Sequence, residues 1–79
     1  MTVKAFVLVE AGVEKSKEVV EALEKVKGVK SVDAVTGPYD FIVVVEEADV
    51  NSIGSVVTKG IHSVAGISRT ITCIAIKLT

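Results

Sequence analysis

Apolar residues recur along the chain at two spacings, one typical of β-strands and the other typical of amphipathic helices. In the first half, residues 3–10 predict a strand, residues 13–27 a helix and residues 29–36 a second strand. Gly28 follows the helix at the position where a glycine commonly ends one. The inner stripe of this helix is predicted to consist of Val19, Val20, Leu23 and Val26.

The second half repeats this order. Residues 41–46 predict a strand that is apolar without alternation, a helix runs from Asp49 or Asn51 to Val64, and residues 67–78 predict a long β-branched strand. The sequence Val-Lys-Gly-Val at positions 26–29 is echoed 38 residues later by Val-Ala-Gly-Ile at positions 64–67. A duplicated βαβ unit explains this echo and predicts an α+β fold of the form βαββαβ with a four-stranded antiparallel sheet. The second helix is expected to bury Val50, Ile53, Val57, Ile61 and Val64, although Gly54 and Gly60 weaken it by up to about 1 kcal/mol each.

Two helices can cover only one face of such a sheet. An antiparallel sheet whose second face meets water shows polar residues there. Here that face carries Phe6 and Leu8, or Val7 and Val9, depending on the register, together with Val and Ile from the third and fourth strands. We therefore expect a second copy of the sheet to cover it in a two-fold symmetric homodimer.

Composition limits the class of protein. Seventy-nine residues make one domain, and 49% of them are apolar, which is more than a small monomer easily hides. The net charge of −1 and the pI near 5.7 argue against direct binding to nucleic acid. No apolar run approaches the roughly 18 residues of a membrane span. The single cysteine, Cys73, excludes an intrachain disulfide, and we expect a soluble cytoplasmic protein.

The turn between the second and third strands carries the most specific chemistry. It reads Thr-Gly-Pro-Tyr-Asp-Phe from position 36 to position 41. Gly37 and Pro38 suit a tight turn, but a plain hairpin needs neither a phenol nor a carboxylate. Tyr39 and Asp40 could therefore read a small ligand that carries an amino group. Alternatively, Asp40 only bonds to the backbone of the turn, as Asp often does.

Other candidate groups give weaker signals. Thr70 and Thr72 share one face of the last strand and could bond to a ligand, although Thr is common in strands. His62 has no nucleophile partner and is expected at the surface near a helix end, and Cys73 is expected to be a small buried residue. The acidic run at positions 46–49 is expected to favour the start of the second helix. No catalytic, metal or cofactor site is predicted.

The chain resembles the effector-binding domain, or RAM domain, of the Lrp/AsnC family of feast/famine regulators, in a stand-alone form. The resemblance covers nearly all 79 residues, and the turn is its most specific part. The segments that carry it are Lys4-Ala5-Phe6-Val7-Leu8, Lys27-Gly28-Val29, Val35-Thr36-Gly37-Pro38-Tyr39-Asp40-Phe41 and Gly66-Ile67-Ser68-Arg69-Thr70-Ile71-Thr72.

This resemblance implies a ferredoxin-like subunit whose sheets pair into a dimeric α/β barrel. It also implies further assembly of dimers, often into rings of eight, with amino acids bound between dimers. The effector-binding residues that it implies are Gly37, Pro38, Tyr39, Asp40, Thr70 and Thr72. In this interpretation Asp40 receives the ammonium group of the ligand.

One departure from the family is important. Full-length members carry a helix-turn-helix domain before this module, whereas here Met1 is followed at once by the first strand. We therefore expect no DNA-binding domain and no direct contact with DNA, with co-assembly with full-length regulators as one possible way to act. Two alternatives to amino-acid sensing stay open: a purely structural oligomerisation module, and a small enzyme of the dimeric α/β-barrel type, against which the lone His62 argues.

Overall fold

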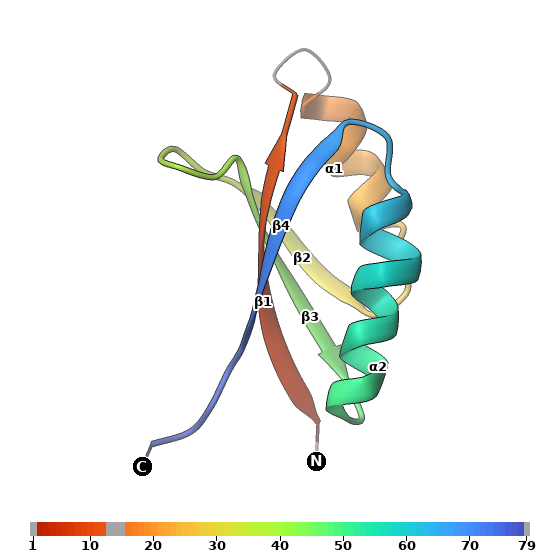
Figure 1. Cartoon of the computed structure of the whole chain (residues 1–79), viewed down its shortest axis with the longest axis vertical. Coiled ribbons are helices and arrows are strands. Elements are labelled where there is room, and N and C mark those ends of the chain that lie inside the picture. The colour runs from red at the N-terminus through yellow and green to blue at the C-terminus, as the bar shows by residue number, and fades with distance from the viewer. Residues whose placement is uncertain (1, 13–15, 79) are drawn as a thin grey trace.

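The computed structural model describes residues 2–12 and 16–78 and has four strands and two helical segments. The strands are β1 (Val3–Ala11), β2 (Val29–Ala34), β3 (Phe41–Glu47) and β4 (Ile67–Ile74). The helices are α1 (Ser16–Glu24) and α2 (Val50–Ser55), the latter continued by the π-helical segment η2 (Val56–Gly60) and the 3₁₀ segment η3 (Ile61–Ser63). All strand pairs are antiparallel in the order β2-β3-β1-β4, and both helices lie on one face (Figure 1). The predicted α+β, ferredoxin-like βαββαβ fold is confirmed.

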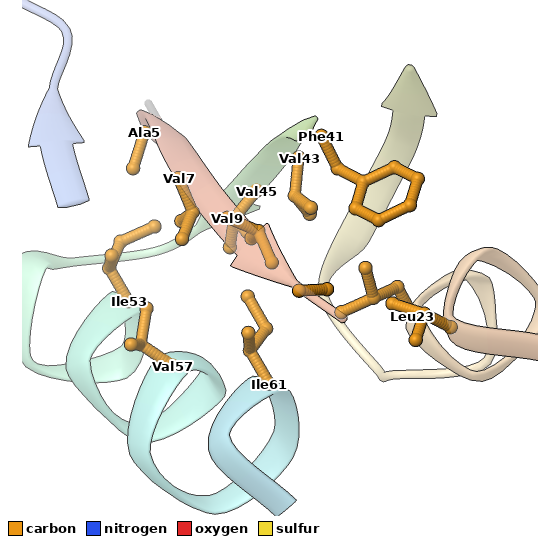
Figure 2. Close-up of a cluster of buried hydrophobic side chains, with 12 residues drawn as sticks. Ala5, Val7, Val9, Leu23, Phe41, Val43, Val45, Ile53, Val57 and Ile61 are labelled. Carbon is orange, nitrogen blue, oxygen red and sulfur yellow. The ribbon is translucent and has the colours of Figure 1, made fainter. Parts of the chain in front are cut away.

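The core lies between the sheet and the helices. Alternate residues of β1 and β3 point to the helix side, where they meet side chains from α1, α2, η2 and η3 (Figure 2). Burying these side chains removes their apolar surface from water, which is the main stabilising term of the fold. The fully buried members from the two central strands are Ala5, Val7, Val9, Val43 and Val45, and those from the helices are Val19, Leu23, Ile53 and Ile61.

The register that the sequence left open is therefore settled. Val7 and Val9 face the helices, and Phe6 and Leu8 face the other way. We call this second side of the sheet the open face. In the cross-strand pairs, Leu8 lies between Ile42 and Ile71, and Phe6 lies between Val44 and Cys73. The open face of one chain is thus an apolar patch three strands wide.

Helix α1 is shorter than predicted at its C-terminal end. It stops at Glu24 rather than at residue 27, because Lys25 and Val26 donate to carbonyls only three residues back. Such bonds tighten the last turn into 3₁₀ geometry. Gly28 then adopts the positive φ of 99° that a helix-ending glycine provides. The predicted start at Val13 lies outside the described residues.

The second helix contains the predicted buried residues Ile53, Val57 and Ile61, but it is not a regular α-helix. Its hydrogen bonding changes from α to π at Val56 and to 3₁₀ at Ile61. The prediction that Val50 is a core residue was wrong, since 56% of its surface is exposed at the start of α2.

Two predicted strand ends were also too long. β2 ends at Ala34, the residue that pairs with the first residue of β3. β4 ends at Ile74 rather than at residue 78, because its partner β1 begins at Val3 and offers only the Lys4 carbonyl to Ala75 beyond the paired region. Residues 75–78 run past the sheet, on the side away from the helices (Figure 1).

Candidate functional site

The turn between β2 and β3 projects from the sheet on the side away from the helices (Figure 1). Gly37 has a φ of 125°, a conformation that L side chains rarely adopt, so the turn requires a glycine there. A hydrogen bond of 2.9 Å from the Val35 N–H to the Asp40 carbonyl closes the turn. Gly37 and Pro38 are exposed, whereas Tyr39 and Asp40 are half-buried against the end of the sheet.

Asp40 holds the end of β1 through two bonds. Its backbone N–H donates to the Val9 carbonyl at 2.9 Å, and its Oδ2 accepts the Ala11 N–H at 2.9 Å. The carboxylate thus satisfies a part-buried backbone donor just where the ladder between β1 and β3 ends. The bond uses the Oδ2 oxygen, and no other hydrogen bond to this carboxylate comes from residues 2–12 or 16–78.

Tyr39 is joined to β4 by Arg69. The guanidinium NH2 of Arg69 donates to the Tyr39 hydroxyl at 3.0 Å, and its central carbon lies 5.7 Å from the centre of the Tyr39 ring. Both the hydrogen bond and the cation–π contact hold the arginine over the turn. Arg69 is the cross-strand neighbour of Glu10, so the arginine reaches across β1 to make these contacts.

Thr70 is joined to the helical layer instead. It pairs with Val9 across the strands and therefore lies on the helix side of the sheet. Its Oγ1 lies 2.7 Å from His62 Nε2, on η3. An open pocket of about 320 Å³ beside this bond is lined by His62, Ile67, Ser68, Arg69 and Thr70.

The structure therefore brings the predicted site residues together only in part. Tyr39 and Asp40 meet the end of β1 and the start of β4, and Thr70 lies next to Arg69. Thr72 pairs with Val7 one step further along β4 and is exposed, without a side-chain hydrogen bond to the turn in the described ranges. A role for Thr72 in the same site requires a ligand or a second copy to bridge the gap.

Arg69 is the residue that the sequence argument missed. It stands inside the segment that resembles the family, but no role was assigned to it. Its importance depends on the antiparallel register, which places it beside Glu10 and within reach of Tyr39 on the far side of β1. The alternation of the last strand indicated only that Thr70 and Thr72 share a face.

Two other sequence predictions have clear outcomes. His62 is exposed at the end of the helical layer, as predicted. The expectation that Cys73 is buried was wrong for the single chain, since Cys73 is a free, exposed thiol on the open face, opposite Phe6. Strand β4 is at the edge of the sheet, so its outer side has no neighbouring strand from the described part of the chain to shelter the thiol.

The acidic run after β3 serves the second helix. Asp49 is its N-cap, and its Oδ1 accepts the Ser52 N–H at 2.7 Å. This hydrogen bond lowers the pKa of the Asp49 carboxyl below its usual value of 3.8. The structural interpretation of this run is therefore confirmed for Asp49.

Residues 2–12 and 16–78 contain neither a candidate metal site nor a candidate membrane-spanning helix. No group of three or more His, Cys, Asp or Glu side chains there is placed to hold a metal ion. No helix of this part of the chain is long and apolar enough to cross a membrane.

Comparison with known protein families identifies the family to which this chain is similar. The model of the Lrp/AsnC ligand binding domain matches residues 4–79. An uncharacterized HTH-type transcriptional regulator of Pyrococcus furiosus is 31% identical over 59 residues, which are 75% of this chain and 39% of the regulator. The chain thus spans well under half the length of that curated relative.

Solved structures agree with the fold. TTHA0845 from Thermus thermophilus superposes with a TM-score of 0.90 at 36% identity, covering 98% of this chain and 96% of that one. The transcriptional regulator NMB0573 from Neisseria meningitidis, solved as a complex with L-Met, superposes with a TM-score of 0.84 at 20% identity. The match covers 96% of this chain and 51% of the regulator. At 20% identity it supports the fold alone.

Proposed function

The chain belongs to the Lrp/AsnC ligand-binding domain family, and from this premise we propose that it is an amino-acid-sensing module that works by self-association. Copies pair through the open face into a dimeric α/β barrel, and dimers assemble further, into a ring such as an octamer. A free amino acid binds between dimers at the turn and shifts the state of assembly.

The open face is the observation that supports self-association most directly. Phe6 is 37% exposed and Ile71 is 41% exposed, and both belong to the continuous apolar patch around Leu8. Large contiguous apolar patches on a soluble protein mark interaction sites. Because β2 carries the polar residues Ser31 and Asp33 opposite Val44 and Ile42, the patch has a polar border on that side, as interfaces commonly do.

The turn supports the sensing role. Gly37, Pro38, Tyr39 and Asp40 form a projecting loop (Figure 1), in which Asp40 bonds to the end of β1 and Tyr39 bonds to Arg69, the residue before Thr70 in β4. The Oδ1 oxygen of Asp40 can accept an ammonium group as a charge-assisted hydrogen bond. Binding between copies would supply the remaining contacts, including any from Thr72. The L-Met complex of NMB0573 makes methionine a natural first ligand to test.

The test is the mass of the assembly. The protein is passed over a sizing column with light-scattering detection, alone and with each of the twenty amino acids at millimolar concentration. We expect an assembly larger than a dimer whose mass changes with one or a few amino acids. A monomer under every condition would contradict the self-association.

A structural oligomerisation module is the second candidate. It is favoured by the bond from Ala11 N–H to Asp40 Oδ2, which gives the carboxylate a role in the fold without any ligand. This candidate predicts the same assembly, with no response to any amino acid by mass or by calorimetry.

The proposed role is regulatory rather than enzymatic. The two relatives described above as regulators bear the names of transcriptional regulators. With a net charge of −1, the module is proposed to act in the cytoplasm without contacting DNA itself. Full-length Lrp/AsnC regulators are proposed as partners, and co-purification of a tagged regulator with this chain would test that.

A further inference from the structure

A second pocket, of about 350 Å³, lies at the end of the sheet opposite the turn. Its lining includes Val26 and Lys27 from the segment after α1, Glu47 from the end of β3, and Ser55, Val56 and Lys59 from the second helix. Glu47 is the last residue of β3, whereas the turn precedes the first residue of that strand. At about 3.3 Å per residue, the length of β3 separates the pocket from the turn by roughly 20 Å.

Two glycines allow the walls of this pocket to approach each other closely. A Cβ at Gly60 would overlap the side chain of Val26, and a Cβ at Gly28 would overlap the side chains of Glu47 and Val56. The second helix therefore packs directly against the segment that joins α1 to β2. The helix has π-helical hydrogen bonding from Val56 to Gly60, at this contact. Such widened turns occur frequently at functional sites.

The pocket carries more positive than negative charge. Lys27 and Lys59 contribute two ammonium groups and Glu47 contributes one carboxylate, and none of the three forms an ion pair within residues 2–12 and 16–78. The second helix adds no acid, because residues 50–63 contain neither Asp nor Glu. Glu47 Oε2 lies 2.6 Å from the point that a Cβ of Gly28 would occupy, so the carboxylate is placed against the start of β2. An anion in the pocket would therefore meet two cations and one carboxylate.

One hydroxyl group in the pocket lacks the partner that its neighbours have. The hydroxyl of Thr58 donates to the Gly54 carbonyl at 2.9 Å, and that of Ser63 donates to the Gly60 carbonyl at 2.6 Å. The hydroxyl of Ser55 makes no such bond to any residue in the described part of the chain. A serine hydroxyl has one O–H to donate, so Ser55 adds a donor to the two ammonium groups.

We propose that this pocket binds a phosphate group, either free or as the monoester of a small organic molecule. A phosphate group carries a charge of about −1.5 to −2 near pH 7 and has three strong acceptor oxygens, which suit two ammonium groups and one hydroxyl. Lysine binds phosphate as a point charge on a flexible stem, so Lys27 and Lys59 can close onto it. A carboxylate ligand has a smaller charge to set against the repulsion by Glu47. This site goes beyond the proposed amino-acid sensing and does not depend on it.

The apolar part of the lining decides between the two forms of the ligand. Val26 and Val56 are half-buried residues of the pocket wall. A pocket of about 350 Å³ falls within the range that small organic ligands occupy, and it is larger than a bare phosphate needs. We therefore expect a phosphate monoester to bind more tightly than inorganic phosphate does.

The test is a titration of the whole chain with sodium phosphate and, separately, with glycerol phosphate, at an ionic strength kept constant with sodium chloride. Backbone amide shifts measured by NMR give both the location and the affinity. Lys27→Gln and Lys59→Gln should each weaken binding about two- to fivefold, the range for a solvent-exposed ion pair. Glu47→Gln should strengthen binding by a similar factor, because it removes the repulsive charge. A general disturbance of the fold would not produce these opposite signs.

Two matched controls lie close to the pocket. Lys25→Gln removes an exposed cation two residues before Lys27, from a position outside the lining, and should leave the affinity unchanged. Ser55→Ala should weaken phosphate binding about two- to tenfold, the range for one lost hydrogen bond. Thr58→Ala removes a hydroxyl that donates to its own helix instead, so it should have no effect on binding.

The expected result is a saturable shift that is largest at the amides of Ser55, Lys59 and Gly60. No saturable shift with either phosphate would overturn the proposal, as would shifts centred on residues 37–40. Unchanged or weaker binding in Glu47→Gln would also overturn it. Tighter binding of glycerol phosphate than of inorganic phosphate would identify an organic phosphate as the ligand, and equal binding would identify free phosphate.

Discussion

The carboxylate of Asp40 can serve the fold and the ligand with two different oxygens. Oδ2 accepts the Ala11 N–H and so joins the turn to the end of β1. Oδ1 is the oxygen that the sensing hypothesis assigns to an ammonium group. The first role needs only an acceptor, whereas the second needs a negative charge. A substitution that separates these properties therefore separates the two roles.

Asp40→Asn and Asp40→Ala are the corresponding pair of variants. The asparagine keeps a carbonyl acceptor for Ala11, so its free energy of unfolding should change little, while ligand affinity should fall about tenfold or more with the lost charge. The alanine removes the acceptor as well and should lower the free energy of unfolding by about 1–3 kcal/mol. Denaturant unfolding and calorimetry measure the two effects. Unchanged ligand affinity in Asp40→Asn would remove the ammonium site from Asp40.

Single residues also show where sequence reasoning stops. The need for glycine at position 37 followed from turn chemistry, and its φ of 125° confirms it. The contact between Tyr39 and Arg69 did not follow, because it joins residues 30 positions apart through the register of three strands. The location of Cys73 was wrong because an edge strand of one chain offers it no cover.

At the scale of elements, the second helix departs furthest from its predicted form. Its apolar spacing gave three correct buried residues, Ile53, Val57 and Ile61, but spacing does not report how closely a helix can approach its neighbour. Gly60 lies so close to Val26 that a Cβ at this position would overlap the valine side chain. Thr58 also donates to the Gly54 carbonyl at 2.9 Å, a type of bond that often bends helices. The π and 3₁₀ turns lie at this crowded contact.

Gly60→Ala and Gly54→Ala should therefore act in opposite directions. Alanine favours helix over glycine by up to about 1 kcal/mol, and a Cβ at Gly54 meets nothing within 4 Å, so Gly54→Ala should raise the free energy of unfolding by roughly 0.5–1 kcal/mol. At Gly60 the overlap with Val26 should outweigh that gain and lower the free energy of unfolding by about 1–3 kcal/mol. Chemical denaturation followed by circular dichroism measures both. Stabilisation by both substitutions would show that the close contact is absent in solution.

The N-cap of α2 makes a pH-dependent contribution to stability. The Ser52 N–H holds the pKa of Asp49 below 3.8, so the folded chain binds this proton less tightly than the unfolded chain does. The stabilisation is therefore complete above pH 3.8 and is lost as the pH falls through the lowered pKa. Asp49→Asn keeps a good capping acceptor without a titrating group, and it should flatten the acid end of the stability curve. Thermal melts between pH 2 and pH 6 compare the two, and identical slopes would contradict the assignment.

At the scale of the whole molecule, the apolar residues divide between two surfaces. One set fills the space between sheet and helices, and the other forms the open face. The sequence predicted both surfaces, because β1 is apolar on each side at its centre. The sequence could not assign the residues of β1 to the core or to the open face. Val7 and Val9 can fill a core as well as Phe6 and Leu8 can. Packing against α1 and α2 made that choice.

Leu8→Lys should break the assembly, because it places a charge at the centre of the open face, between Ile42 and Ile71. The expected mass by light scattering is that of one chain, 8.3 kDa, with a lower melting temperature because a domain of this size is marginal alone. Val50→Lys is the matched control, since it replaces an exposed apolar residue at the start of α2, remote from the open face. An unchanged mass for Leu8→Lys would exclude the open face as the interface.

The run of residues 75–78 past the end of β1 gives the chain a built-in protease reporter. Ile76 and Leu78 are 77% and 86% exposed, and Lys77 lies between them in a backbone that has left the ladder. Trypsin needs an extended, unpaired segment to cut after a lysine. A chain by itself should therefore be trimmed after Lys77 within minutes, whereas a neighbour that covers the segment should protect it. The fraction of trimmed chains, read by mass spectrometry, would then follow the assembly at concentrations too low for light scattering.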